Sequence, residues 1–392
     1  MMKKKLKHGL ARIFDFITIR ILYPITYKIH SREAVNPNKV ILLEPRFPET
    51  TDSLLQIKKR LEEMGGYQVL EMSLGFEIEH ISEIHRRTMR FLREFATAAY
   101  VFTTDSNKAV GGFNMRPETQ MIQCWHACGA FKRFGFSTAG ASFGGSSYKQ
   151  RMYPNHRNYT LVTVSSDEVV WAYEEAMGLE GRNLVKPLGV SRTDVFYDEM
   201  FVKDACRQVE EAVPQTKGRK VILYAPTFRG RVIEAKSPDQ MDLKLMKEEL
   251  GDEYVVLIKH HPFVKNRPEI PEQLGDFASD VTDILDIDKL LCRADVCISD
   301  YSSLIFEYSL FNRPMIFFAY DLDDYYDHRG FYYPYDEMAP GPIVKSTEEI
   351  VEIIKGIEAG WDDSRVVQFK TKFMGACDGN VTSGILEEVG IK

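Results

Sequence analysis

The chain has 392 residues, and 57 acidic side chains outweigh 50 basic ones to give a net charge of −7 at pH 7. This balance argues against a dedicated nucleic-acid binder, which usually carries excess positive charge. With 44% hydrophobic residues, 27% charged residues and six scattered cysteines, the composition predicts a soluble protein of about two domains from a reducing, cytosolic compartment.

The first 32 residues differ from the rest because they are basic and amphipathic. They carry eight Lys or Arg residues against a single acidic residue, Asp15. The apolar side chains recur at spacings of three and four, which places them on one stripe of a helix: Leu6, Leu10, Ile13, Phe14, Ile17 and Ile21. Asp15 and Arg20 interrupt the apolar run, so neither a signal peptide nor a spanning helix fits.

We therefore predict that residues 1–32 form a helix lying in the interface of an anionic membrane, so that the protein is peripheral. The side chains expected to contact the membrane are Lys3, Lys4, Lys5, Lys7, Phe14 and Ile17. A helix packed on the protein's own surface is the alternative.

After this segment, short apolar runs alternate with helical patterns, such as the helix expected over residues 81–95. The candidate strands span residues 40–43, 68–72, 99–103, 121–125, 161–164, 221–225, 254–258, 296–299 and 315–320. This alternation predicts an α/β protein with doubly wound parallel sheets built from βαβ units. We place the domains at residues 33–205 and 206–392, with a ligand cleft between them at the carboxyl ends of the strands.

Four polar motifs follow predicted strands directly. The first contains His126, at the end of the strand over residues 121–125, where an imidazole with a pKa near neutrality could take a proton from a hydroxyl group. Cys124 and Cys128 flank His126 too closely for a structural zinc site, so we expect no metal and no cofactor. A purely structural histidine is the alternative.

The second motif holds Thr227 and Arg229, whose hydroxyl and guanidinium groups suit phosphate oxygens. Lys259 and His261 in the third motif offer further positive donors, and Pro262 restricts their turn. A solvated arginine at the strand end is the alternative for the second motif, and the third motif taken alone does not decide between a structural and a binding role.

The fourth motif, Ser299-Asp300-Tyr301-Ser302-Ser303, lies between a strand and the helical pattern over residues 304–311. Backbone N–H groups and serine hydroxyls at a helix start can bind a phosphate, and Glu307 could accept a hydrogen bond from a ribose hydroxyl. A simple N-cap by Ser302 or Ser303 is the alternative.

The run SDYSSLIFEYSLFNRPMIFFAYDLDDYYDHRGFYYPYDEMAPGPIVKS over residues 299–346 resembles the CDP-glycerol:poly(glycerophosphate) glycerophosphotransferase family. These are the teichoic acid primases and polymerases of Gram-positive bacteria, and they include CDP-ribitol users. The segments WHACGAFKRFG, LGVSRTDVF, YAPTFR and IKHHP extend the resemblance over about residues 120–380.

This resemblance implies a two-domain GT-B-like fold in which the C-terminal domain holds a CDP-alcohol. It implies that an acceptor hydroxyl on an undecaprenyl-diphosphate-linked teichoic acid precursor attacks the β-phosphorus of CDP-glycerol or CDP-ribitol and releases CMP. The expected location is the cytoplasmic face of the cell membrane.

The family's motif residues fall on His126 as a general base and on His261 as a contact of the pyrophosphate. They also fall on Ser302 and Ser303 for the phosphates, Glu307 for the ribose, and the strand-end pair Thr227 and Arg229. The chain departs from the family where Ala127 replaces the usual glycine after the histidine, which affects the acceptor site. A sugar-nucleotide glycosyltransferase and a membrane-bound polymer-binding protein without activity remain the alternatives.

Overall fold

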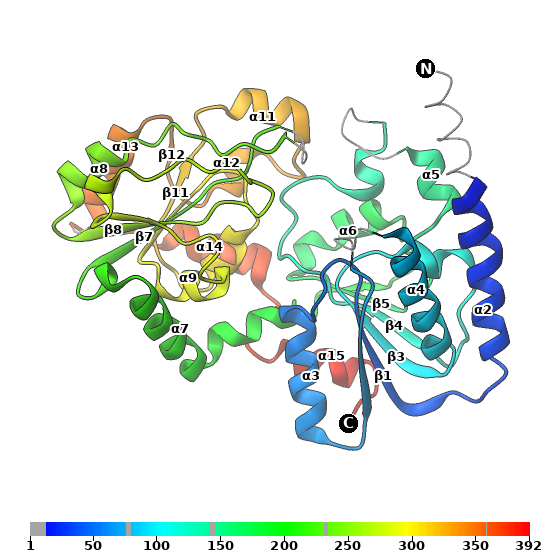
Figure 1. The fold of residues 1–392 in the computed structure, drawn as a ribbon. Coiled ribbons are helices and arrows are strands. Elements are labelled where there is room, and N and C mark those ends of the chain that lie inside the picture. The colour runs from blue at the N-terminus through cyan, green and yellow to red at the C-terminus, as the bar shows by residue number, and fades with distance from the viewer. Residues whose placement is uncertain (1–12, 76–79, 141–145, 231–233, 358) are drawn as a thin grey trace. The chain divides into compact units, whose positions relative to one another are not determined.

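The computed structural model describes residues 13–75, 80–140, 146–230, 234–357 and 359–392. Within these residues the chain forms two compact units, each built on one parallel six-stranded sheet (Figure 1). The predicted α/β class with two parallel sheets is confirmed.

Unit 1 consists of residues 1–127, 134–194 and 376–392, of which the first twelve lie outside the described residues. Its sheet has the strand order β2-β1-β3-β4-β5-β6. The strands are β1 (Asn36–Glu44), β2 (Gln68–Ser73), β3 (Ala98–Thr103), β4 (Gln120–Gln123), β5 (Leu161–Thr163) and β6 (Val185–Lys186). The helices are α2 (Tyr23–His30), α3 (Asp52–Met64), α4 (Ile81–Phe95), α5 (Ser147–Met152), α6 (Val170–Met177) and α15 (Val381–Glu388).

Unit 2 consists of residues 128–133 and 195–375. Its sheet has the order β12-β11-β10-β7-β8-β9. The strands are β7 (Lys220–Ala225), β8 (Tyr254–Ile258), β9 (Ala278–Asp280), β10 (Val296–Ser299), β11 (Met315–Phe318) and β12 (Ile343–Val344). The helices are α7 (Glu199–Ala212), α8 (Leu243–Leu250), α9 (Ile287–Arg293), α10 (Leu304–Ser309), α11 (Leu322–Arg329), α12 (Tyr335–Met338), α13 (Thr347–Ile357) and α14 (Ser364–Met374).

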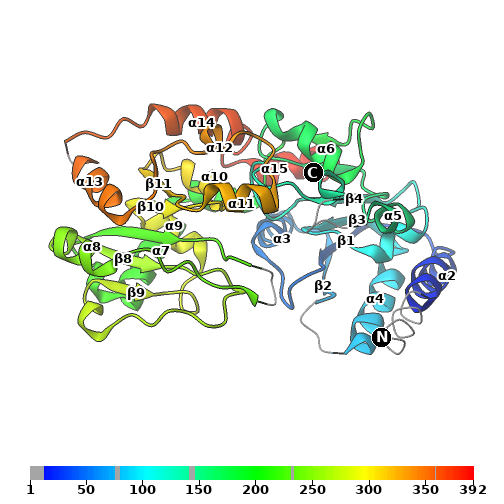
Figure 2. The same cartoon turned by 90° about the horizontal axis from the view of Figure 1, so that it is seen from above.

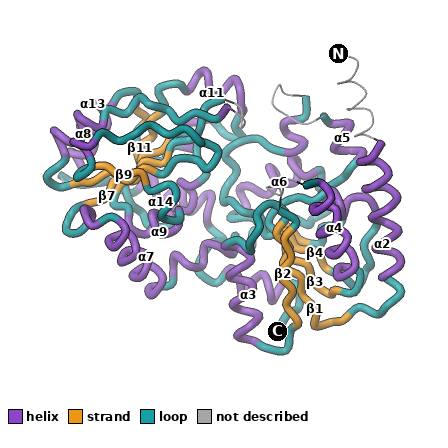
Figure 3. The backbone as a smooth tube through the Cα atoms, in the orientation of Figure 1, coloured by secondary structure: helices purple, strands orange, loops and turns teal. Residues whose placement is uncertain are grey.

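The sheet of unit 2 is apolar on both faces, as buried parallel sheets require. Alternate residues of β7 and β8 pack with Met246 and Leu250 of α8 and with Ile350 and Ile354 of α13 in one buried cluster. The other face of the sheet lies toward α7 and α9, which are drawn below the strands in Figure 1 and overlap them in the view from above in Figure 2. Figure 3 shows the same layering of helices around the strands in both units.

Strand pairing decides where the polar motifs meet. In unit 2, Ser299 of β10 pairs with Ala225 of β7 and with Phe317 of β11. In unit 1, Thr103 of β3 pairs with Leu43 of β1 and with Gln123 of β4. In each sheet, the residues that follow these neighbouring strands therefore lie beside one another at the carboxyl ends of the strands.

The division into units differs from the predicted one at residue 205. The chain passes from unit 1 to unit 2 after Asp194, because α7 at the predicted junction packs against α9 of unit 2. The last 17 residues return to unit 1, where the Asp194 carboxylate accepts hydrogen bonds from the backbone N–H groups of Val381 and Thr382 at the start of α15.

The predicted strands are present, with small differences at their ends. β4 ends at Gln123 rather than at residue 125, because Trp125 has a φ of 56°, which no extended strand accommodates. The strands that sequence patterns missed are β6, β9 and β12. Each has two or three residues and lies at or toward the edge of its sheet, too short for a periodic signal.

Candidate active site

His126 follows β4 in unit 1 and is held on several sides. Its Nδ1 lies 2.9 Å from the carbonyl oxygen of Thr104. A carbonyl oxygen only accepts hydrogen bonds, so Nδ1 carries the proton and Nε2 keeps its lone pair in the neutral ring. The half-buried imidazole therefore has the tautomer of a base.

The backbone before His126 is strained. Trp125 adopts a left-handed conformation with φ 56°, and a bulky residue there is costly. Its N–H donates to the side-chain oxygen of Gln123, whose amide in turn donates to the Tyr159 hydroxyl. The indole stacks on the His126 ring at 4.6 Å between centroids. The left-handed residue therefore ends the strand direction just before His126, and its hydrogen bond and ring contact stabilise this turn.

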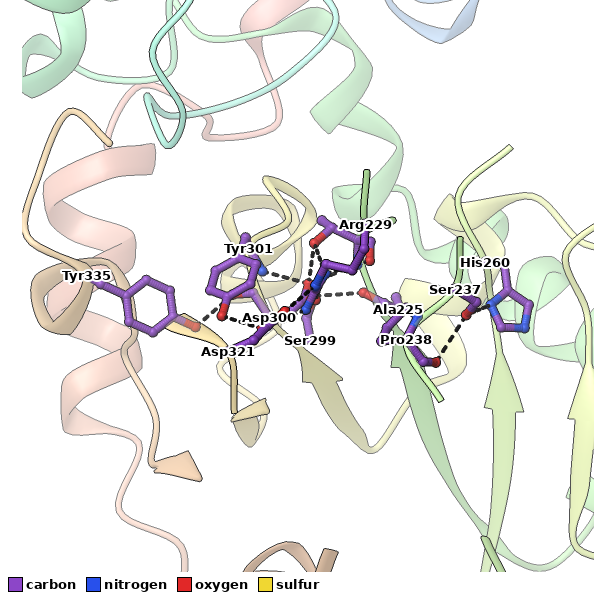
Figure 4. Close-up of polar contacts among 11 residues, drawn as sticks. Ala225, Arg229, Ser237, Pro238, His260, Ser299, Asp300, Tyr301, Asp321 and Tyr335 are labelled. Atoms are coloured by element: carbon purple, nitrogen blue, oxygen red, sulfur yellow. Dashed lines mark hydrogen bonds and ion pairs between the residues drawn. The ribbon is translucent and has the colours of Figure 1, made fainter. Parts of the chain in front are cut away.

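In unit 2, Thr227 and Arg229 contact Asp300 near the ends of β7 and β10. Figure 4 shows Arg229 beside Asp300. The buried Asp300 carboxylate accepts from the backbone N–H and the hydroxyl of Thr227, each at 2.9 Å, and from the N–H of Tyr301. It also pairs with Arg229 at 2.9 Å. Arg229 makes a two-pronged contact with Asp321 after β11, at 2.5 and 3.0 Å.

Aromatic rings complete the surroundings of this guanidinium group. The Cζ atom of Arg229 lies 5.1 Å from the ring centroid of Tyr301 and 5.2 Å from the ring centroid of Tyr325. Cation–π attraction operates at these distances. Burial opposes the positive charge, but the hydrogen bonds and charges of Asp321 and Asp300 outweigh it and raise the pKa of Arg229. Arg229 and Thr227 are thus engaged by internal acidic partners, and neither is the solvated strand end that was the alternative. Their direct binding of phosphate stays a prediction.

Lys259, also predicted to bind an anion, holds the neighbouring loop. Its ammonium group donates to the carbonyl oxygens of Thr282 and Leu285 at 2.7 and 2.5 Å, and burial lowers its pKa. His260, which sequence reasoning left unassigned, is buried and bonded to the Ser237 hydroxyl through Nδ1 at 2.8 Å (Figure 4).

His261 is partly exposed and has a different environment. Its ring packs against Phe228 and Phe263 at 4.8 and 4.6 Å. Its Nδ1 accepts from the N–H of Phe263 at 3.2 Å, so the neutral ring carries its proton on Nε2. The neutral His261 ring is therefore an N–H donor at Nε2, whereas the neutral His126 ring is an acceptor at Nε2.

The serine turn before α10 lies at the N-terminus of that helix and caps it only weakly. The Ser302 hydroxyl accepts a weak hydrogen bond from Leu304 N–H at 3.4 Å, while Ser303 occupies the N-cap position without a side-chain cap bond. Both serines are partly exposed. Glu307 is only 4% exposed, so it lies inside unit 2, and its role toward a ribose stays a prediction.

The described part of the N-terminal segment has two apolar faces. Tyr23 and Tyr27 are buried, and Tyr27 packs against Phe95 of α4 at 5.1 Å. The opposite face leaves apolar side chains 45–58% exposed: Ile13, Phe14, Phe16, Ile17, Ile21, Ile25 and Ile29. Lys3, Lys4, Lys5 and Lys7 lie outside the described residues. No helix in the described part of the chain is long and apolar enough to cross a bilayer.

Sequence reasoning did not identify three acidic side chains as partners of site residues: Glu44, Asp300 and Asp321. Each is the residue that ends a strand or follows one within three positions. That placement was the available signal, but pairing them with Thr104, Thr227 and Arg229 requires the strand order.

Comparison with known proteins agrees with this architecture. The CDP-Glycerol:Poly(glycerophosphate) glycerophosphotransferase profile matches residues 25–390. The teichoic acid poly(ribitol-phosphate) polymerase of Bacillus spizizenii is 35% identical over 94% of this chain and 58% of its own length. The teichoic acid ribitol-phosphate primase of the same organism is 38% identical over 69% of each chain.

Among solved structures, a histidine-to-alanine variant of the wall teichoic acid polymerase TagF matches with a TM-score of 0.78 at 22% identity, over 99% of this chain and 96% of that chain. This likeness concerns the fold. The chain spans little more than half the length of the ribitol-phosphate polymerases that it matches. The match across nearly all of its length and the 38% identity to the primase place this chain in the CDP-glycerol:poly(glycerophosphate) glycerophosphotransferase family.

Proposed function

We propose that this protein transfers a polyol phosphate from a CDP-alcohol to a hydroxyl group of a lipid-linked teichoic acid precursor, with release of CMP. The observation that carries the proposal is the family match over residues 25–390. The residues support it independently. Phosphoryl transfer depends on positioning, on stabilisation of the phosphate charge and on a base, and we assign the last two to His261 and His126.

In this proposal His126 accepts the proton of the attacking hydroxyl through Nε2. The acceptor oxygen bonds to the β-phosphorus, and the bond from that phosphorus to the bridging oxygen breaks, so that CMP leaves with the electron pair. His261 donates its Nε2–H to the phosphate oxygens, and Ser302 and Ser303 contribute hydroxyl and backbone donors.

The remaining predicted substrate contacts take positioning roles. Arg229 and Thr227 fix Asp300 and thereby the turn that carries the two serines, since Asp300 precedes that turn by two residues. Lys259 fixes the backbone beside His261 through two carbonyl groups.

Within the CDP-alcohols, we propose CDP-ribitol as the donor. The ribitol-phosphate enzymes are 35–38% identical to this chain, whereas glycerol-phosphate enzymes are 27–31% identical. The donor choice rests on this difference alone, and a direct comparison of the two donors tests it.

The exposed apolar face of the N-terminal helix supports a peripheral association with the cytoplasmic face of an anionic membrane. An undecaprenyl-diphosphate-linked acceptor is embedded in such a membrane. Docking of the opposite face on α4 leaves the apolar stripe facing outward, as an interfacial helix requires.

The test is CMP release from CDP-ribitol and CDP-glycerol in parallel, with a lipid-linked disaccharide and its glycerophosphate-primed form as acceptors. We expect release from CDP-ribitol, and dependence on priming separates a polymerase from a primase. His126→Ala is expected to abolish release and to leave CDP-alcohol binding, measured by calorimetry, unchanged. Loss of binding in that variant contradicts the role of His126 as a base, and release of UDP from UDP-sugars instead contradicts the proposed function.

A further inference from the structure

Glu44 ends β1 of unit 1 and is a carboxylate buried to 1% exposure. Among the described residues no Lys or Arg lies within ion-pair distance of it. Four hydrogen bonds compensate its charge instead. The N–H groups of Arg46 and Phe47 donate to Oε1 at 3.0 and 3.3 Å, and the hydroxyls of Thr51 and Thr104 donate to Oε2 at 2.5 and 2.9 Å.

Three of these four bonds have a local explanation. Arg46, Phe47 and Thr51 belong to the loop between β1 and α3, and a carboxylate that gathers them shapes that loop. The fourth bond does not. Thr104 follows β3, 60 residues further along the chain, and it reaches Glu44 because β1 and β3 are neighbours in the sheet.

Thr104 is also the residue whose carbonyl oxygen accepts the Nδ1 proton of His126. A single residue thus connects the buried carboxylate, through its hydroxyl, with the imidazole, through its backbone. Because the threonine is 2% exposed and its hydroxyl donates to Glu44, a charge-assisted hydrogen bond holds the side chain and the Cα atom of Thr104. The carbonyl group attached to that Cα atom cannot move with it toward or away from His126 without breaking this bond.

We infer that Glu44 is a positioning residue for His126 and acts through Thr104. This inference rests on the proposed function, in which His126 is the base. The carboxylate fixes the Thr104 carbonyl, the carbonyl holds the proton on Nδ1, and the lone pair on Nε2 keeps its tautomer and its direction. Misplacing a catalytic group by a fraction of an ångström to an ångström lowers the rate of transfer.

Other charged groups near this turn are already paired. Arg46 lies 3.4 Å from Asp105. Arg192 donates to the His126 carbonyl oxygen at 3.3 Å and pairs with Asp52 at 3.4 Å. The Arg192 contact holds the main chain of His126, whereas the ring of His126 donates through Nδ1 to the Thr104 carbonyl oxygen.

The decisive comparison is between two threonines that donate to the same carboxylate oxygen. Thr104→Val removes the hydroxyl of the residue whose carbonyl oxygen contacts His126. Thr51→Val removes the hydroxyl of a residue in the loop between β1 and α3. We expect Thr104→Val and Glu44→Gln to lower kcat about 10-fold with an unchanged KM for the CDP-alcohol. Thr51→Val should lower the stability and change kcat less than about two-fold, and Thr104→Ser, which keeps the hydroxyl, should retain wild-type kcat.

A second readout does not need activity. In the protein labelled with ¹⁵N-histidine, the ring signals of His126, assigned by their absence in His126→Gln, should report the Nδ1–H tautomer. Thr104→Val should shift them toward a tautomer mixture, while Thr51→Val should not. Equal loss of kcat in the two valine variants, or an unchanged tautomer in Thr104→Val, overturns the inference. Absence of transfer by the wild-type protein instead refutes the proposed function, and the ring signals still decide the positioning role.

Discussion

The ion pair between Arg229 and Asp300 gives the sharpest prediction for unit 2. Asp300 is 2% exposed, accepts three hydrogen bonds from Thr227 and Tyr301, and lies 2.9 Å from the guanidinium group. Asp300→Asn keeps the size of the side chain and removes its charge. The variant thereby leaves a half-buried arginine with Asp321 as its remaining acidic partner.

Removing one partner of a buried ion pair costs roughly 3–5 kcal/mol. Because Asp321 still makes its two-pronged contact and the asparagine oxygen can still accept from one or two donors, we expect the lower end, about 3 kcal/mol. With a urea m-value of about 3 kcal/mol/M, that loss lowers the unfolding midpoint by about 1 M.

The measurement is urea unfolding followed by hydrogen exchange of peptides from β7 and β10, which report on unit 2 alone. Asp283→Asn is the matched control, since Asp283 makes a two-pronged contact with Arg267 in the same unit at 2.6 and 2.8 Å but is 73% exposed. Water screens that pair, so its loss should lower the midpoint much less. A midpoint in Asp300→Asn no lower than in the control refutes the account of this cluster.

Three further predictions concern other parts of the chain. In Gly129→Ala the added methyl group would overlap the Phe306 ring, and the backbone φ of 63° is unfavourable for alanine. We therefore expect a lower melting temperature by calorimetry. An unchanged melting temperature would contradict the close packing of residues 128–133 in unit 2. Burial lowers the pKa of His156 from 6.5 to about 4. Between these pH values the unfolded chain binds a proton at this histidine and the folded chain does not. The free energy of unfolding should therefore fall by at most about 3 kcal/mol between pH 6.5 and 4. His156→Gln should lose this part of the pH dependence, and an identical slope in the variant would argue against it. Finally, replacing the exposed Ile25 and Ile29 with serine should abolish co-sedimentation with phosphatidylglycerol vesicles, whereas Leu55→Ser, at a 42% exposed site on α3, should not; equal binding by both variants would reject the helix as the membrane contact.

The positions of the secondary-structure elements followed from the sequence because they depend on local pattern. The helix at Ile81–Phe95 and the strands at Tyr254–Ile258 and Val296–Ser299 have the predicted bounds. Their apolar runs are long enough, and bounded clearly enough, for periodicity to define them. The edge strands β6, β9 and β12, with two or three residues each, carry no such pattern.

The sequence also placed histidines and serines at strand ends, and family resemblance supplied their expected roles. It could not separate side chains that face outward from those with internal partners. Arg229 and Lys259 have the chemistry of phosphate ligands, yet Arg229 is paired with Asp300 and Asp321, and Lys259 with two carbonyl groups. Glu307 likewise lies inside the unit at 4% exposure.

The physical reason is that these partners are distant along the chain. Asp300 lies 73 positions from Thr227, and Thr104 lies 60 positions from Glu44. Only the order of the parallel strands brings such pairs to one edge of a sheet. The sequence by itself determined which residues could act as base, donor or anion ligand, and the tertiary structure decided which of them have neighbours that fix a tautomer, neutralise a charge or leave the group facing outward.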